Sequence, residues 1–221
     1  MQNPIPHRWR VPVLLIGLSL VPFAATASRL IWLASADAVP DPAMTRFGGD
    51  WATLVAHILL GSMFLILAAF QYSPELRIRH RLWHRVSGRI AMIAGTLAGL
   101  SGIWLVIAYP PSSLATLVMD TLRVFFGAAL AGSIALAFAA IRRSDVPAHR
   151  AWMIRAFAIA IAGSTQALVI GLWLAFSQTL TPDSATALIT LGFVINITVA
   201  EWRIRAPSHI PTIQVPHRSF T

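Results

Sequence analysis

The sequence predicts an all-α integral membrane protein with six transmembrane helices. Of its 221 residues, 57% are hydrophobic and only 11% are charged, whereas soluble domains carry about a quarter charged residues. The apolar residues also gather in runs of roughly 20, the length that a helix needs to cross about 30 Å of hydrocarbon. We expect one transmembrane domain over residues 1–206 and a flexible cytoplasmic tail over 207–221.

Six segments are long and apolar enough to be these helices. Within the first, Ala25-Thr26-Ala27 resembles a signal-peptidase site, but the apolar run resumes through Leu33, so we expect this helix to be retained. The fifth is uninterrupted, and we see no helix broken by Gly or Pro of the kind that often marks a transporter site. The six segments run approximately over 11–33, 52–72, 88–109, 118–141, 152–176 and 184–202.

Charge placement predicts the orientation. All 17 basic residues are arginine, and all except Arg29, Arg46 and Arg123 lie before the first segment, around the second and fourth connections, or in the tail, while the alternate connections carry mostly aspartate. By the positive-inside rule, both termini are cytoplasmic in a bacterial inner membrane. The net charge of +9 therefore indicates anionic phospholipid headgroups as a partner rather than nucleic acid. The absence of cysteine excludes disulfides and iron–sulfur ligation.

The middle of the chain contains an internal repeat, with halves at about 52–109 and 118–176. In each half a polar residue near the start of one helix is followed, at a similar distance, by a His-Arg pair that leads into the next helix. This predicts two parallel helical hairpins, helices two–three and four–five, with helices one and six outside the repeat. The matched positions are His57 and Arg123, His84-Arg85 and His149-Arg150, and Gly102–Leu105 and Gly171–Leu174.

Ionisable residues inside membrane helices are costly and require a reason. We expect His57 and Arg123 to form an outer polar site, with Gln166 as a neighbour. The alternative is that Arg123 extends to the headgroups and pairs with Asp120, one turn away.

A second group of polar residues is expected near the cytoplasmic face. His84 and His149 should lie there at a similar depth, and small residues on their helix faces should let the helices approach closely. The group is either a ligand site or a structural cluster in which Glu201 neutralises an arginine and the histidines bond to headgroups or helix ends. Its other members are Arg85, Arg89, Arg150, Arg155, Gln71 and Asn196.

Three motifs resemble those of a bacterial inner-membrane family classed as a domain of unknown function. They are HRxxGR at His84–Arg89, HRxWMxR at His149–Arg155 and NxxxAEWxxR at Asn196–Arg205, preceded by QYSPELR at Gln71–Arg77. The resemblance covers helices two to six and implies a multi-helix membrane protein without an established activity. Gln166 stands where the resemblance suggests a basic residue.

A more distant likeness is to the transmembrane di-haem cytochromes b, which use one histidine from each of four core helices. His57, His84 and His149 match three of these positions, but Arg123 occupies the fourth, so two bis-histidine haems are excluded on this mapping. The likeness implies at most one haem b, ligated by His84 and His149, with Arg89 and Arg155 facing its propionates.

Three functions remain open from the sequence. The first is a redox protein with one haem b near the cytoplasmic face that exchanges electrons with quinone. The second is a protein that binds or transports a small anionic or lipid-like molecule, and the third is a membrane scaffold or assembly factor. Whether the protein is an enzyme stays open, although no nucleophile–base arrangement indicates hydrolysis. No metal-site spacing such as HExxH is present, and we expect no metal site.

Overall fold

The computed structural model describes residues 51–206 and the separate positions 17, 18, 24, 27, 31, 46 and 47. These residues form helices and no strand, so the all-α prediction is confirmed. The first predicted span and the tail lie outside the continuously described part. The helices are α3 (Ala52–Gln71), α4 (Pro74–Arg79), α5 (Arg81–Ile107), α6 (Leu117–Arg142), α7 (Val146–Ala160), α8 (Ala162–Ser177) and α9 (Pro182–Arg205).

Five of the six predicted spans are present, because α7 and α8 together form one of them. Large apolar side chains are exposed along the bundle, as expected of surfaces that face lipid rather than water. Examples are Leu97, Trp104, Phe125 and Phe138, with exposed fractions of 45% to 60%. The described chain is therefore a polytopic membrane protein.

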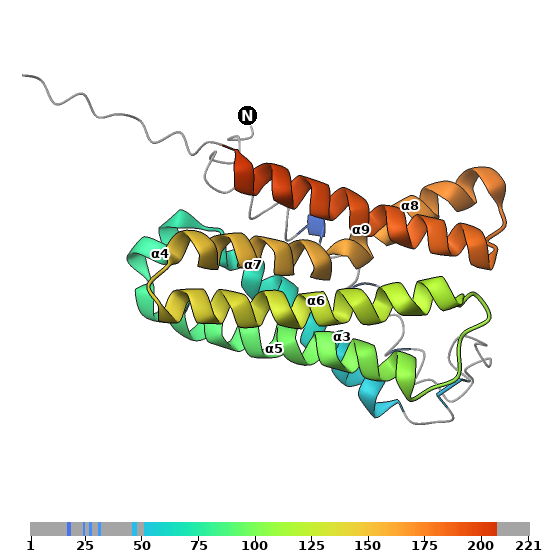
Figure 1. Cartoon of the computed structure of the whole chain (residues 1–221), viewed down its shortest axis with the longest axis horizontal. Helices are drawn as coiled ribbons and strands as arrows, with labels where there is room; N and C mark the ends of the chain where they lie inside the picture. Colours follow the sequence, from blue (N-terminus) through green and yellow to red (C-terminus); the bar gives the residue numbers. More distant parts are fainter. Residues whose placement is uncertain are drawn as a thin grey trace, which may run out of the picture.

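The helices pack in the order α3, α5, α6, α7, α9, with α8 paired to α9. Figure 1 shows α4 and the α6–α7 turn at one end of the bundle, which we call the α4 end, and the α8–α9 connection at the other, which we call the far end. The pairs α3–α5 and α6–α7 are the hairpins of the predicted repeat. The two-fold relation between the hairpins stays a prediction.

Polar side chains at the loops fix where several helices begin. The Thr116 side chain accepts a hydrogen bond from the Met119 N–H (3.0 Å), and Asp145 does the same for Ala148 (3.0 Å). Thr181 forms a capping box with Ser184 at the start of α9. Such caps satisfy N–H groups that lack partners inside the helix.

The α5–α6 contact depends on two glycines. A Cβ added to Gly99 would lie 2.7 Å from the carbonyl oxygen of Gly127, and one added to Gly127 would lie 2.9 Å from the carbonyl oxygen of Gly99. The two backbones therefore touch, which only residues without a side chain allow. The expectation that small residues bring neighbouring helices together is confirmed here.

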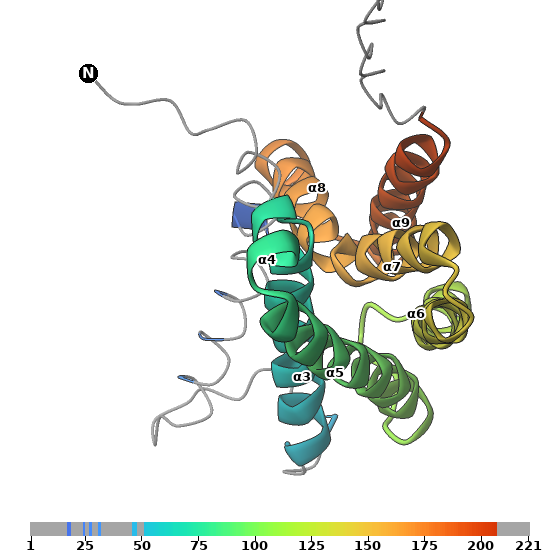
Figure 2. The same cartoon turned by 90° about the vertical axis from the view of Figure 1, so that its left-hand side faces the viewer.

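The fifth predicted helix is broken, so the expectation of an uninterrupted segment is wrong. Helix α7 ends at Ala160 and α8 begins at Ala162; Figure 2, a view along the bundle, shows α8 turned away from the axis of α7. Ile161 has φ −78° and ψ −4°, and the Ser164 N–H bonds the Ile161 carbonyl (3.0 Å), a tighter turn than in an α-helix. Gly163-Ser164 follows directly, and Gly/Ser pairs are a known cause of kinks.

Two of the spans are longer than the bilayer requires. Helix α5 has 27 residues, or about 40 Å at 1.5 Å per residue, and α7 and α8 together cover 32 residues on the two sides of the break. The extra first turns of α5 carry Arg81, Arg85 and Arg89, and arginines are costly in hydrocarbon, so we expect the excess length to lie outside the hydrocarbon layer. This explains why α5 begins at Arg81 rather than at the predicted residue 88.

Candidate functional site

A cavity of about 620 Å³ lies in the half of the bundle nearer the far end, bordered by α3, α5, α6 and residues on both sides of the α7–α8 break. Pockets for small molecules measure roughly 300–1,000 Å³. Its lining is mostly apolar and rich in glycine and alanine. The polar side chains in the lining are those of Arg46, His57, Ser62, Ser112 and Arg123.

His57 is held against α5. Its Nδ1 lies 3.0 Å from the Ala98 carbonyl oxygen and 3.1 Å from Ser101 Oγ. Because a carbonyl only accepts, Nδ1 carries the hydrogen in this contact and Nε2 is the acceptor of the ring. Gly102 makes room for the ring, since a Cβ there would lie 3.1 Å from His57 Cε1.

Arg123 is paired within its own helix. Its Nη1 donates to Asp120 Oδ1 at 3.0 Å, with exposed fractions of 35% and 25% for the two side chains. This is the pairing that the sequence left open as an alternative. The structure nevertheless brings Arg123 and His57 to the same cavity.

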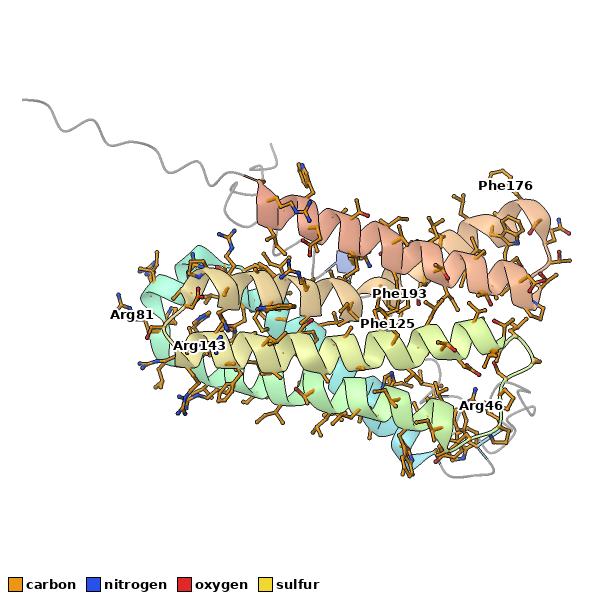
Figure 3. All side chains as sticks on the ribbon, viewed as in Figure 1. Arg46, Arg81, Phe125, Arg143, Phe176 and Phe193 are labelled. Carbon is orange, nitrogen blue, oxygen red and sulfur yellow. The ribbon has the colours of Figure 1, made fainter. Side chains whose placement is uncertain are left out.

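Arg46, which the sequence analysis did not select, also reaches this cavity. Its Nη2 donates to the Leu105 carbonyl oxygen (2.9 Å), and its guanidinium lies 4.9 Å from the centre of the Phe47 ring. Figure 3 shows Arg46 at the far end of the molecule, with Arg81 and Arg143 at the opposite end. Burial, and then the charge of Arg123, lower the pKa of Arg46, while Asp120 raises it.

The structure places Gln166 elsewhere. Its Nε2 donates to the Ile189 carbonyl oxygen of α9 (3.2 Å), and its Cγ would lie only 2.5 Å from a Cβ added to Gly192. Gln166 thus takes part in the α8–α9 contact and is not among the residues that line the cavity.

The two histidines that the repeat predicts at a similar depth both lie toward the α4 end, in the first turns of α5 and α7. His84 is within electrostatic reach of His149, and within the described part of the chain His84 Nδ1 is buried without a hydrogen-bond partner. The His149 Nδ1–H donates to the Ala137 carbonyl oxygen of α6 (2.9 Å), which leaves Nε2 as the acceptor. Neither histidine lines the 620 Å³ cavity.

An ion pair links α7 to α9. Arg155 Nε and Nη2 donate to the two carboxylate oxygens of Glu201 at 2.6 and 3.1 Å, and the Arg155 guanidinium lies 4.6 Å from the centre of the Trp152 ring. Arg205 lies 3.7 Å from the same carboxylate but is 80% exposed. Glu201 is therefore committed to Arg155 in a two-point contact.

The other predicted inner residues are separate from this pair. Gln71 Nε2 donates to Ser87 Oγ (2.9 Å), which joins α3 to α5. Asn196 Oδ1 accepts from Thr165 (3.1 Å), which joins α9 to α8. The remaining predicted members, Arg85, Arg89 and Arg150, are exposed.

The fold and the polar residues at both ends define a polytopic α-helical membrane protein. A family described as "Predicted membrane protein (DUF2306)" matches residues 54–204, which take in nearly all of the five described spans and the motifs at His84, His149 and Asn196. The chain belongs to this family, and the predicted resemblance to a membrane family of unknown function is confirmed. No curated protein and no solved structure matches the chain. The likeness to cytochromes b stays a prediction.

Proposed function

We propose that the protein binds one lipid-like molecule, taken up from the bilayer, in the cavity at the far end. The observation that carries this proposal is a mostly apolar cavity of about 620 Å³ into which a few polar side chains converge. An apolar chamber with a few orienting polar groups is the usual form of a small-molecule site.

The position of the polar groups supports an amphipathic ligand. Arg46 precedes α3, and His57 and Arg123 lie within the first turns of α3 and α6, so all three belong to the far end. Deeper in the bundle, the wall is formed by residues such as Phe64 and Ile159. A molecule with a polar head and an apolar chain fits this arrangement, with its head at the polar far end of the cavity and its chain along the apolar wall.

The arginine distribution supports an orientation of the cavity in the membrane. We place the α4 end, with its exposed arginines, at the cytoplasmic face of a bacterial inner membrane, where these arginines contact anionic phospholipid headgroups. The cavity then belongs to the outer leaflet. Binding or transport is the function that this arrangement supports best.

The cavity can be filled by substitution at Gly61. Gly61 lines it, and a Cβ there would meet no atom of the described residues within 4 Å, so we expect Gly61→Leu to fold and to weaken binding at least tenfold. Oleate and oleyl alcohol are suitable probes, measured by native mass spectrometry on delipidated protein. Gly132→Leu is the matched control, because Gly132 likewise has no described atom close to its Cβ position and is not among the residues that line the cavity.

Two results would contradict the proposal. One is Gly61→Leu protein that binds both probes as the wild type does, and the other is wild-type protein that binds neither. The second result would favour the scaffold or assembly role that the sequence also left open.

Haem b between His84 and His149 is the second candidate. The Nδ1–H of His149 is oriented by the Ala137 carbonyl, which is how metal-ligating histidines are usually held, and His84 is close by. A bound haem would supply one-electron transfer to a quinone. The bond between Arg155 and Glu201 weakens the expected role of Arg155 toward a propionate, so this candidate has less support than the cavity.

Visible absorption of the purified protein tests the haem directly. Protein from haem-replete cells is expected to show a Soret band that is lost in His84→Ala and in His149→Ala and kept in His57→Ala. A colourless preparation would end this candidate and leave the cavity proposal untouched.

A further inference from the structure

We propose that the ligand of the far-end cavity is an anionic amphiphile whose charged head is bound by Arg46 and Arg123. This inference rests on the proposed function and names the chemistry of its ligand. The head is an anionic oxygen group, either the carboxylate of a free fatty acid or the phosphate of a phospholipid, and the chain lies along the apolar wall.

The first argument is the balance of charge at the cavity. Arg46 lies within electrostatic reach of both Arg123 and Asp120, and Asp120 is already bonded to Arg123. Among the residues that the structure describes, two guanidinium groups thus share one carboxylate. The excess positive charge at this depth attracts an anion, because a charge that is partly removed from water is stabilised by an opposite charge nearby.

The second argument is an unused donor. Arg46 Nη2 is bonded to the Leu105 carbonyl, but its Nε–H is buried and has no partner among the residues that the structure describes. A buried charged donor without an acceptor is expensive, and buried polar groups are nearly always bonded. A carboxylate or phosphate oxygen is the acceptor that a guanidinium binds most strongly.

The third argument is the path of the chain. The cavity lining continues from Arg46 and Arg123 to apolar residues of α3 and α6, such as Leu65 and Leu130, and to Ile159 beside the α7–α8 break. The head therefore lies toward the membrane surface and the chain toward its centre. This is the orientation that the same molecule has in the surrounding leaflet, so entry requires no inversion.

The test compares ligands that share a chain and differ in charge. Binding of oleate, oleyl alcohol and dioleoylphosphatidylglycerol is measured at about pH 8, where a carboxyl group is ionised. We expect the wild type to bind oleate or the phospholipid at least tenfold more tightly than oleyl alcohol. Preference for oleate identifies a free fatty acid, and preference for the phospholipid identifies a membrane lipid.

The variants then assign the preference to the two arginines. Arg46→Gln should reduce the charge preference to less than about threefold, and so should the double variant Asp120→Asn/Arg123→Gln, which leaves no carboxylate without a partner. Arg142→Gln, an exposed arginine at the α4 end, should behave as the wild type. The double variant keeps the test valid if Arg46→Gln does not fold.

The outcomes separate this inference from the proposed function. Equal binding of oleate and oleyl alcohol by the wild type, or an undiminished preference in Arg46→Gln, would overturn the anionic head and leave a neutral ligand in the cavity. A wild-type protein that binds none of the three ligands would overturn both this inference and the proposed function.

Discussion

Replacing Gly99 with leucine should lower the stability of the protein by about 3 kcal/mol, the upper end of the usual cost of overpacking. A new Cβ at this position would lie 2.7 Å from the Gly127 carbonyl oxygen. That oxygen belongs to the backbone, so no change of rotamer can relieve the contact. Helices α5 and α6 must separate, and the wall of the cavity formed by Gly99 and Gly127 must separate with them.

Unfolding by sodium dodecyl sulfate in mixed micelles, followed by circular dichroism, would measure this loss. Gly171→Leu is the control, because a Cβ at Gly171 would meet no atom within 4 Å. It should change stability by less than about 0.5 kcal/mol, as surface substitutions usually do. A Gly99→Leu variant as stable as this control would show that the two backbones do not touch.

Replacing Glu201 with glutamine should lower stability by about 1–3 kcal/mol. Full loss of one partner from a buried ion pair costs about 3–5 kcal/mol. The side chains of Arg155 and Glu201 are 28% and 27% exposed, so water reduces the cost. The loss arises because Arg155, which lies against Trp152 inside the helix packing, keeps its charge without a carboxylate.

Two further variants show whether the cost comes from the unpaired charge. The double variant Arg155→Leu/Glu201→Leu should recover part of the loss, because replacing a pair by apolar residues is often neutral. Arg205→Gln should cost less than about 1 kcal/mol, as exposed ion pairs do. The same unfolding assay applies, and an equal effect of Glu201→Gln and Arg205→Gln would contradict a structural role for the Arg155 contact.

Much of the fold could be predicted because the number and position of the helices depend on the length of the apolar segments. Segments of roughly 20 apolar residues are helices in a bilayer regardless of their neighbours, and five of the predicted spans are present. The pairing of α3 with α5 and of α6 with α7 also agrees with the expected hairpins. Close packing at Gly99 could be predicted because glycine spacing on one helix face is a local signal.

The candidate site was less predictable, because it depends on backbone direction and on contacts between distant residues. The break at Ile161 changes the direction of the helix, so a helical face extrapolated from His149 does not continue through it, and Gln166 lies against α9. Arg46 reaches Leu105, 59 residues away. The sequence feature that could have marked Arg46 as a site residue is that it is an arginine in a connection that otherwise carries aspartate.

The break at Ile161 also determines which helices form one side of the cavity wall. Ile159 and Ala160, before the break, and Gly163 and Ala167, after it, are all part of the wall. This side of the wall therefore consists of two helices, α7 and α8, that run in different directions. A ligand in the proposed cavity would contact the ends of both helices, whereas a straight helix in the same place would offer a single face.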